Sequence, residues 1–187
     1  GPLLRCALLC NDAHLKSQDG GHVVNGDPME GALVALAMKA GLDAEHVRAE
    51  WPRSDEIPFD AQYRYMASRH TAANGTTMVF VKGAPERVLA MCAFEATASG
   101  DAPLDIDRWA REIARAAAEG ERILGFAALP TGAAGERLTQ ADVEHGLTFL
   151  GLVGFIDPPR AEVIQAIAEC HSAGIAVKMI TGDHAAT

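Results

Sequence analysis

The sequence predicts an α+β protein: a twisted, mostly antiparallel sheet flanked by helices, followed by a truncated α/β unit. Two strand-like segments joined by a tight, glycine-containing loop indicate antiparallel pairing. Capped amphipathic segments on both sides of them indicate helices that cover the sheet. A strand–helix–strand pattern near the C-terminus is typical of a parallel sheet. We expect the first part to span residues 1–150 and the second to span 151–187.

The N-terminal part is predicted to be helical, with one loop. Apolar spacing indicates a short helix over 3–14, and the polar, glycine-containing segment 17–25 indicates a loop. Asp27, followed by a proline and by Glu30, is a typical helix start, with Asp27 as the N-cap and Glu30 as the acid of a capping box. That helix should end at a glycine cap, and a further short helix is predicted over 43–50.

The middle of the chain is predicted to be rich in strands. β-Branched and aromatic residues crowd the segment 76–82, and Ala73-Asn74-Gly75 is typical of a hairpin loop. The two strands beside this loop should therefore be neighbours. Predicted strands cover 56–59, 64–70, 76–82 and 123–129, and predicted helices cover 85–92, 105–119 and 139–144.

The C-terminal segments have a different pattern. The apolar run 147–156 lacks the alternation of a half-exposed strand, so we expect a buried strand of a parallel sheet. A helix over 161–173, ended by Gly174, and a second buried strand over 175–180 would complete a β-α-β unit.

The chain is acidic, with 16 lysines and arginines against 25 aspartates and glutamates, a formal net charge of −9. Sequence-independent binding to nucleic acid or to an anionic membrane needs clustered cations, so we expect no nucleic-acid partner and no direct membrane contact. The longest apolar stretch, 146–156, is shorter than the ~20 residues of a membrane helix. A local basic pocket is compatible with this charge balance.

Several common site patterns are absent from the sequence. It has neither of the usual glycine-rich phosphate loops, no HExxH zinc pattern and no CxxC pair among its four cysteines. Cys6, Cys10 and His14 share one side of the predicted helix 3–14, but they lack the paired spacing that structural zinc prefers. Because buried cysteines are common core residues, we expect no metal there.

The hairpin brings candidate ligand-binding side chains together. With Gly75 in the left-handed position of a three-residue loop, the register places Lys82 opposite Met66. Arg64 then lies diagonally across on the same face, and Phe59 lies near the start of that strand. A ring, two cations and a thioether on one surface suit a flat aromatic base with an anionic tail, because stacking contributes roughly 1–3 kcal/mol per base.

Simpler structural roles fit the same residues. Phe59 follows a proline and could pack in the core, while Arg64 and Lys82 could be solvated strand charges. Glu30 is explained by the capping box, and Arg122 could cover a helix end. On the residues alone, both interpretations stay open.

Several short segments stand out in a fixed order along the chain: GDPMEGAL (26–33), Pro58-Phe59, KGAPE (82–86), Gly120-Glu121-Arg122, DPPR (157–160) and TGD (181–183). Together they closely resemble the cytosolic region of cation-transporting P-type ATPases. Any one tetrapeptide is weak evidence, but several in matching order and spacing are strong, and the resemblance spans most of the chain.

The resemblance implies a nucleotide-binding domain, inserted into a phosphorylation domain of haloacid-dehalogenase type, that holds ATP while an aspartate elsewhere takes the γ-phosphate. It implies that Phe59 stacks on adenine and that Glu30 contacts the adenine edge or orders the pocket. Lys82 and Gly83 would line the channel for adenine and phosphates, and Arg122 would bridge toward the phosphates.

Other residues receive roles from the same resemblance. Arg64 stands where the family usually has a lysine, which keeps the charge but changes its geometry, and Met66 would line the wall. The segment 157–160 would be the return hinge into the phosphorylation domain. Residues expected to face the phosphates once that domain is complete are Asp157, Arg160, Thr181, Gly182 and Asp183.

Two motifs of the family are absent from the chain: DKTGT, which carries the phosphorylated aspartate, and GDGxND, which helps to hold Mg²⁺. We therefore expect a piece of a P-type ATPase that binds ATP or ADP weakly, has no catalytic residue of its own and does not hydrolyse ATP. In the intact enzyme the cofactors would be ATP and Mg²⁺, on the cytoplasmic side of a membrane. The partners would be the phosphorylation, actuator and transmembrane domains of the same chain.

Two alternative functions are kept. A free-standing phosphatase of the haloacid-dehalogenase group fits the C-terminal pattern and TGD, but it needs a nucleophilic aspartate at a strand end. Asp105-Ile106-Asp107 opens a helix instead. The other alternative is a non-catalytic interaction domain with a vestigial pocket, in which substitution of Phe59 and Lys82 would leave nucleotide affinity unchanged.

Overall fold

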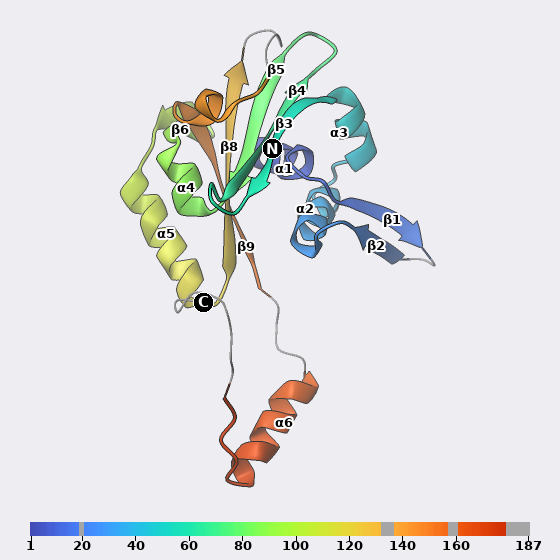
Figure 1. Cartoon of the computed structure of the whole chain (residues 1–187), viewed down its shortest axis with the longest axis vertical. Coiled ribbons are helices and arrows are strands. Elements are labelled where there is room, and N and C mark those ends of the chain that lie inside the picture. The colour runs from blue at the N-terminus through green and yellow to red at the C-terminus, as the bar shows by residue number, and fades with distance from the viewer. Residues whose placement is uncertain (19–20, 132–136, 157–160, 179–187) are drawn as a thin grey trace.

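The computed structural model describes residues 1–18, 21–131, 137–156 and 161–178, and its main unit is a seven-stranded sheet (Figure 1). The strand order is β3-β4-β5-β8-β9-β6-β7, and all neighbours are antiparallel except β6 and β9. The predicted α+β fold with a mostly antiparallel sheet is confirmed. The strands are β3 (Arg53–Asp60), β4 (Tyr65–Thr71), β5 (Thr77–Gly83), β6 (Cys92–Thr97), β7 (Gly100–Pro103), β8 (Arg122–Thr131) and β9 (Leu147–Phe155).

Helices cover both faces of the sheet, because the side chains of its central strands alternate between two cores. Met66, Phe80 and Phe126 pack with α1 and α2 on one face. Ala67 and Val79 pack with α4 and α5 on the other. The helices are α1 (Pro2–Leu9), α2 (Pro28–Lys39), α3 (Ala44–Glu50), α4 (Pro85–Ala90), α5 (Ile106–Ala118), the 3-10 helix η1 (Gln140–Val143) and α6 (Ala161–Ser172).

The local start, stop and turn signals are confirmed. Asp27 caps α2, Asp105 caps α5, and Gly41 follows α2 with a left-handed φ of 88°. Gly75 closes the β4–β5 hairpin with a φ of 84°, and the register pairs Met66 with Lys82 as predicted. These features depend on residues close together in sequence.

The predicted loop 17–25 is wrong. β1 (His14–Gln18) and β2 (Gly21–Asn25) form an antiparallel hairpin that projects beside α2 in Figure 1, and the preceding helix ends at Leu9. Val23 and Val24 are exposed, so the hairpin lacks the alternation of buried and exposed residues that normally indicates a strand. The β6–β7 hairpin was also not predicted, for the same reason: most of its side chains are exposed.

The predicted C-terminal β-α-β unit is not seen. β9 pairs antiparallel with β8 and joins the seven-stranded sheet, so it is not a strand of a second, parallel sheet. It also crosses the expected boundary at residue 150, and the division of the chain into 1–150 and 151–187 stays a prediction. Residues 175–178 form no strand, and α6 lies apart from the sheet in Figure 1 with Ile164 exposed. None of the described helices is long and apolar enough to span a membrane.

Candidate functional site

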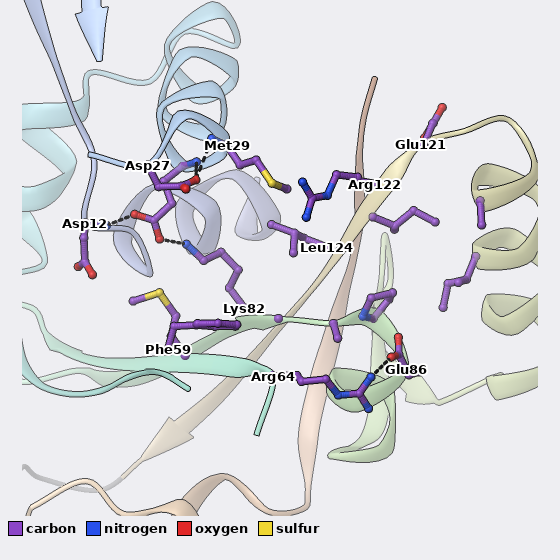
Figure 2. A pocket seen from close by; sticks show the side chains of 18 residues that line it. Asp12, Asp27, Met29, Phe59, Arg64, Lys82, Glu86, Glu121, Arg122 and Leu124 are labelled. Atoms are coloured by element: carbon purple, nitrogen blue, oxygen red, sulfur yellow. Dashed lines mark hydrogen bonds and ion pairs between the residues drawn. The ribbon is translucent and has the colours of Figure 1, made fainter. Parts of the chain in front are cut away.

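A cavity of about 840 Å³ opens where β3 and β5 end and β4 and β8 begin, beside the first turns of α2 and α4. Figure 2 shows the side chains around it, with Phe59 on one side and Met29, Leu124 and Arg122 on the other. Residues predicted to bind the nucleotide all line this cavity, although their roles stay predictions: Glu30, Phe59, Arg64, Met66, Lys82, Gly83 and Arg122.

The first turn of α2 presents Glu30 to the cavity. Asp27 Oδ1 accepts hydrogen bonds from the backbone N–H groups of Met29 at 2.9 Å and Glu30 at 3.2 Å, as expected of an N-cap. The predicted capping role of the Glu30 side chain is wrong, because both of its oxygens have other partners. Oε1 accepts from Lys82 Nζ at 2.5 Å, and Oε2 accepts from the backbone N–H of Asp12 at 3.0 Å.

Lys82 is a buried charge rather than a solvated one. It lies on the inner strand β5, opposite Met66, and its side chain is 7% exposed. A buried ammonium is unfavourable unless an opposite charge compensates it, and the Glu30 carboxylate, itself 18% exposed, does so. The charge of Lys82 is therefore already balanced within the protein.

Phe59 is an exposed ring rather than a core residue. It lies on the edge strand β3 with 64% of its surface exposed, so the core alternative is wrong. The pairing of β3 with β4 shifts between Ile57 and Asp60, and such bulges redirect side chains. Pro58 is tolerated there because an edge strand needs no donor on its open side. The ring is free to stack on a flat ligand.

Arg64 lies just before β4, not within it as predicted. Its φ of 59° is left-handed, which is unusual for a residue with a side chain. Its carbonyl accepts a hydrogen bond from the backbone N–H of Ala84 at 2.9 Å. Gly83 permits this close approach, because a Cβ at that position would lie 2.7 Å from Tyr65 Cα. The Arg64 side chain consequently reaches the first turn of α4 rather than the face of Lys82.

Negatively charged side chains outnumber positively charged ones around the cavity. Arg64 Nη1 bonds Glu86 Oε1 at 2.5 Å, and this pair is drawn in Figure 2. Within the described part of the chain, Arg122 on β8 makes no ion pair. Five carboxylates face three cations across the lining, namely Asp12, Asp27, Glu30, Glu86 and Glu121 against Arg64, Lys82 and Arg122.

Some lining residues were not singled out from the sequence. Glu86 and Glu121 lie inside the KGAPE and Gly120-Glu121-Arg122 segments, so a signal was present. Asp12 had no such signal, because it contributes its backbone N–H from the segment between α1 and β1. The expected phosphate-facing residues lie outside the described residues: Asp157, Arg160, Thr181, Gly182 and Asp183.

The cysteines near the N-terminus belong to the core. Cys6 and Cys10 are fully buried, and burial raises the pKa of both thiols. Their sulfur atoms lie 3.6 Å from the Val81 carbonyl oxygen and 3.7 Å from that of Met66, respectively. The predicted helix 3–14 is too long: α1 ends at Leu9 and His14 lies on β1, so the three residues do not share a helix face.

Comparison with known proteins identifies the family of the chain. Residues 2–162 match the family model described as P-type ATPase, cytoplasmic domain N. The chain is 42% identical over 186 residues to cation-transporting ATPase pma1 of Synechocystis, covering 98% of this chain and 20% of that protein. It is 37% identical over 189 residues to a calcium-transporting ATPase of Bacillus subtilis, covering 99% and 21%. The chain thus spans about a fifth of these relatives. It belongs to the family of cytoplasmic N domains of cation-transporting P-type ATPases.

Proposed function

We propose that the cavity binds ATP, with the adenine against Phe59 and the phosphates toward Arg122. The observation that carries this proposal is a ring with 64% of its surface exposed on the wall of an open cavity that also holds three cations. The volume of about 840 Å³ lies within the range of about 300–1,000 Å³ for small-molecule sites. Membership of the P-type ATPase family supports ATP as the ligand.

The base end of the cavity is already ordered. Phe59 offers a stacking surface, and Met66 adds an apolar contact to the wall. The Glu30 carboxylate accepts two hydrogen bonds within the protein, and its remaining lone pairs can accept one from the exocyclic amine of adenine. Because stacking contributes roughly 1–3 kcal/mol per base, the adenine supplies most of the affinity in this proposal.

The phosphate end is held more weakly. Lys82 is paired with Glu30, and Arg64 is paired with Glu86. Within the described residues, Arg122 has no ion pair, so it can contact a phosphate without breaking one. A triphosphate also meets an excess of carboxylates around the opening. We therefore expect weak, adenine-dominated binding by this chain alone.

In the longer parent protein, we propose that the bound ATP donates its γ-phosphate to an aspartate outside this chain, coupled to cation transport at the cytoplasmic side of a membrane. The names of the relatives, cation-transporting and calcium-transporting ATPases, support this coupling. Segment 151–187 would be the hinge and part of the phosphorylation domain. No group of three or more His, Cys, Asp or Glu side chains in the described ranges is placed to hold a metal, so we assign Mg²⁺ to the nucleotide and to the completed phosphorylation domain.

The experiment compares two exposed phenylalanines. Calorimetric titration with ATP, ADP and adenosine is carried out on the wild-type chain, on Phe59→Ala and on Phe94→Ala, whose ring on β6 is 45% exposed and lies outside the cavity. Phe59→Ala should weaken the binding of ATP and adenosine alike by about 5- to 140-fold, the equivalent of one lost stacking contact. Phe94→Ala should leave both affinities unchanged.

Stability measurements separate a binding role from a structural one. Because Phe59 is mostly exposed, its truncation should change the free energy of unfolding by less than about 0.5 kcal/mol. Absence of any interaction of the wild-type chain with millimolar ATP or ADP would refute the proposal. Equal affinities of the wild type and Phe59→Ala would show that the nucleotide binds elsewhere.

A further inference from the structure

We propose that Glu86 is a specificity-determining residue of this site: it holds the Arg64 guanidinium in an ion pair that the phosphates of a nucleotide must displace. Glu86 would thereby lower the affinity for ATP and ADP without changing that for adenosine. This inference rests on the proposed nucleotide site.

The backbone places the two partners together. Arg64 O accepts a hydrogen bond from the N–H of Ala84, the residue that precedes α4, and Glu86 lies in the first turn of that helix. The N–H of Arg64 donates to Asp60 O at 2.7 Å, which fixes the other side of the same peptide segment. A left-handed φ at a residue with a side chain is unfavourable and persists only where surrounding bonds enforce it. The backbone therefore holds the two residues within reach of each other.

The two ion pairs of the cavity differ in burial. Both have a nitrogen–oxygen distance of 2.5 Å, but the side chains of Lys82 and Glu30 are 7% and 18% exposed, whereas those of Arg64 and Glu86 are 54% and 57% exposed. Opening the buried pair would leave a charge without water or partner. Opening the exposed pair exchanges one solvated partner for another, so Arg64 is the paired cation that can move to a phosphate.

Glu86 affects an anionic ligand in two ways. It neutralises a guanidinium that would otherwise form charge-assisted, bidentate hydrogen bonds with a phosphate. It also adds one of the five carboxylates that repel the anionic tail at the cavity lining. Both effects grow with the number of phosphates and are absent for adenosine, which carries no charge.

The test is Glu86→Gln, which removes the charge and keeps the size of the side chain. Calorimetry at low salt should show ATP bound about 2- to 5-fold more tightly than by the wild type, the effect expected of an exposed ion pair, with adenosine unchanged. The matched control is Glu50→Gln, because Glu50 is equally exposed, has its Oε1 3.5 Å from His46 Nε2 and lies outside the cavity. It should change neither affinity.

A second background tests the pair itself. In Arg64→Gln, the further change Glu86→Gln should produce a smaller gain in ATP affinity than in the wild type, because it then removes only the repulsion by the carboxylate and releases no guanidinium. An equal gain in that background, or an equal gain for adenosine, would overturn the proposal. If the wild type binds ATP but Glu86→Gln does not tighten it, this inference alone fails. If the wild type binds no nucleotide, the proposed function fails with it.

Discussion

Arg53 lies on β3 and is hydrogen-bonded to the segment between α1 and β1 that carries Asp12. We expect Arg53→Lys to lower both the stability of the fold and the affinity of the cavity for its ligand. Its guanidinium donates four hydrogen bonds: to Leu9 O at 3.1 Å, Asn11 O at 2.8 Å, Asp12 Oδ1 at 2.6 Å and Glu56 Oε2 at 2.5 Å. A lysine has the same charge, but its single ammonium cannot reach the four acceptors that a planar guanidinium spans.

The expected size of the effect comes from the bonds that a lysine loses. If it keeps two of the four, two charge-assisted bonds are lost, each contributing about 1.5–3 kcal/mol. The Arg53 side chain is 27% exposed, so water replaces part of that loss. We expect a decrease of about 2 kcal/mol in the free energy of unfolding.

The same substitution should reach the ligand through Glu30. The Asp12 N–H is one of the two groups that hold the Glu30 carboxylate, at 3.0 Å, and Arg53 donates to the neighbouring Asn11 carbonyl in the same segment. Loosening that segment should weaken the binding of ATP and adenosine equally, because Glu30 lies at the proposed base end of the cavity.

Urea denaturation and calorimetry with both ligands measure these effects. The control is Arg115→Lys, because Arg115 on α5 forms exposed ion pairs with Glu112 and with the C-cap residue Glu119, outside the cavity. This substitution should change the free energy of unfolding by less than about 0.5 kcal/mol. The proposed role of Arg53 would be refuted if Arg53→Lys were as stable as Arg115→Lys and bound adenosine as tightly as Arg115→Lys does.

Three further predictions follow from single residues. Burial lowers the pKa of His70 from 6.5 to about 4, although its hydrogen bond to the Trp51 carbonyl opposes the shift. As the pH falls, His70 is therefore protonated in the unfolded chain before it is protonated in the folded one, and the free energy of unfolding should fall by up to about 3 kcal/mol from pH 6.5 toward pH 4. Urea denaturation of His70→Gln at several pH values should lack this pH dependence. Gly83→Ala should lower the free energy of unfolding by more than about 2 kcal/mol, because the added Cβ would collide with the backbone of Arg64 and Tyr65. Gly41→Ala should lower it by only about 1 kcal/mol, because its left-handed φ is unfavourable but the space around it is open. Equal losses in urea denaturation would contradict the close approach at Gly83. Arg122→Gln should weaken ATP several-fold and flatten the salt dependence of its binding, with adenosine unaffected; a salt-insensitive wild type would contradict a role for charge.

Features encoded locally could be predicted from the sequence. The start of α2 at Asp27, the Gly75 turn and the cap of α5 at Asp105 each depend on residues within a few positions of one another. The turn also set the register that places Lys82 opposite Met66. The choice of cavity residues came from this register together with the family resemblance.

Features that depend on distant partners could not be predicted. The apolar residues of β9 indicate burial on both faces but not direction, and the strand runs antiparallel to β8 and parallel to β6. The local sequence pattern predicts that the Glu30 side chain caps α2, but its partners are Lys82, 52 positions away, and the backbone of Asp12. The pairing of Arg64 with Glu86 depends on the left-handed φ of Arg64, which no sequence pattern predicts.

The contrast between the two ends of the cavity has a consequence for the proposed phosphoryl donation. At the base end, the Lys82–Glu30 pair is fixed before the ligand arrives, so little ordering is needed when adenine binds. At the phosphate end, the cations are exposed or engaged with Glu86, and their attraction to phosphate is weakened by salt. Any interaction with the γ-phosphate that is made in the bound ATP but lost during transfer would slow that transfer, because it stabilises the reactant and not the transition state. A domain that donates the γ-phosphate to an aspartate outside itself should therefore hold ATP mainly by its base, which is the distribution of contacts that we propose for this cavity.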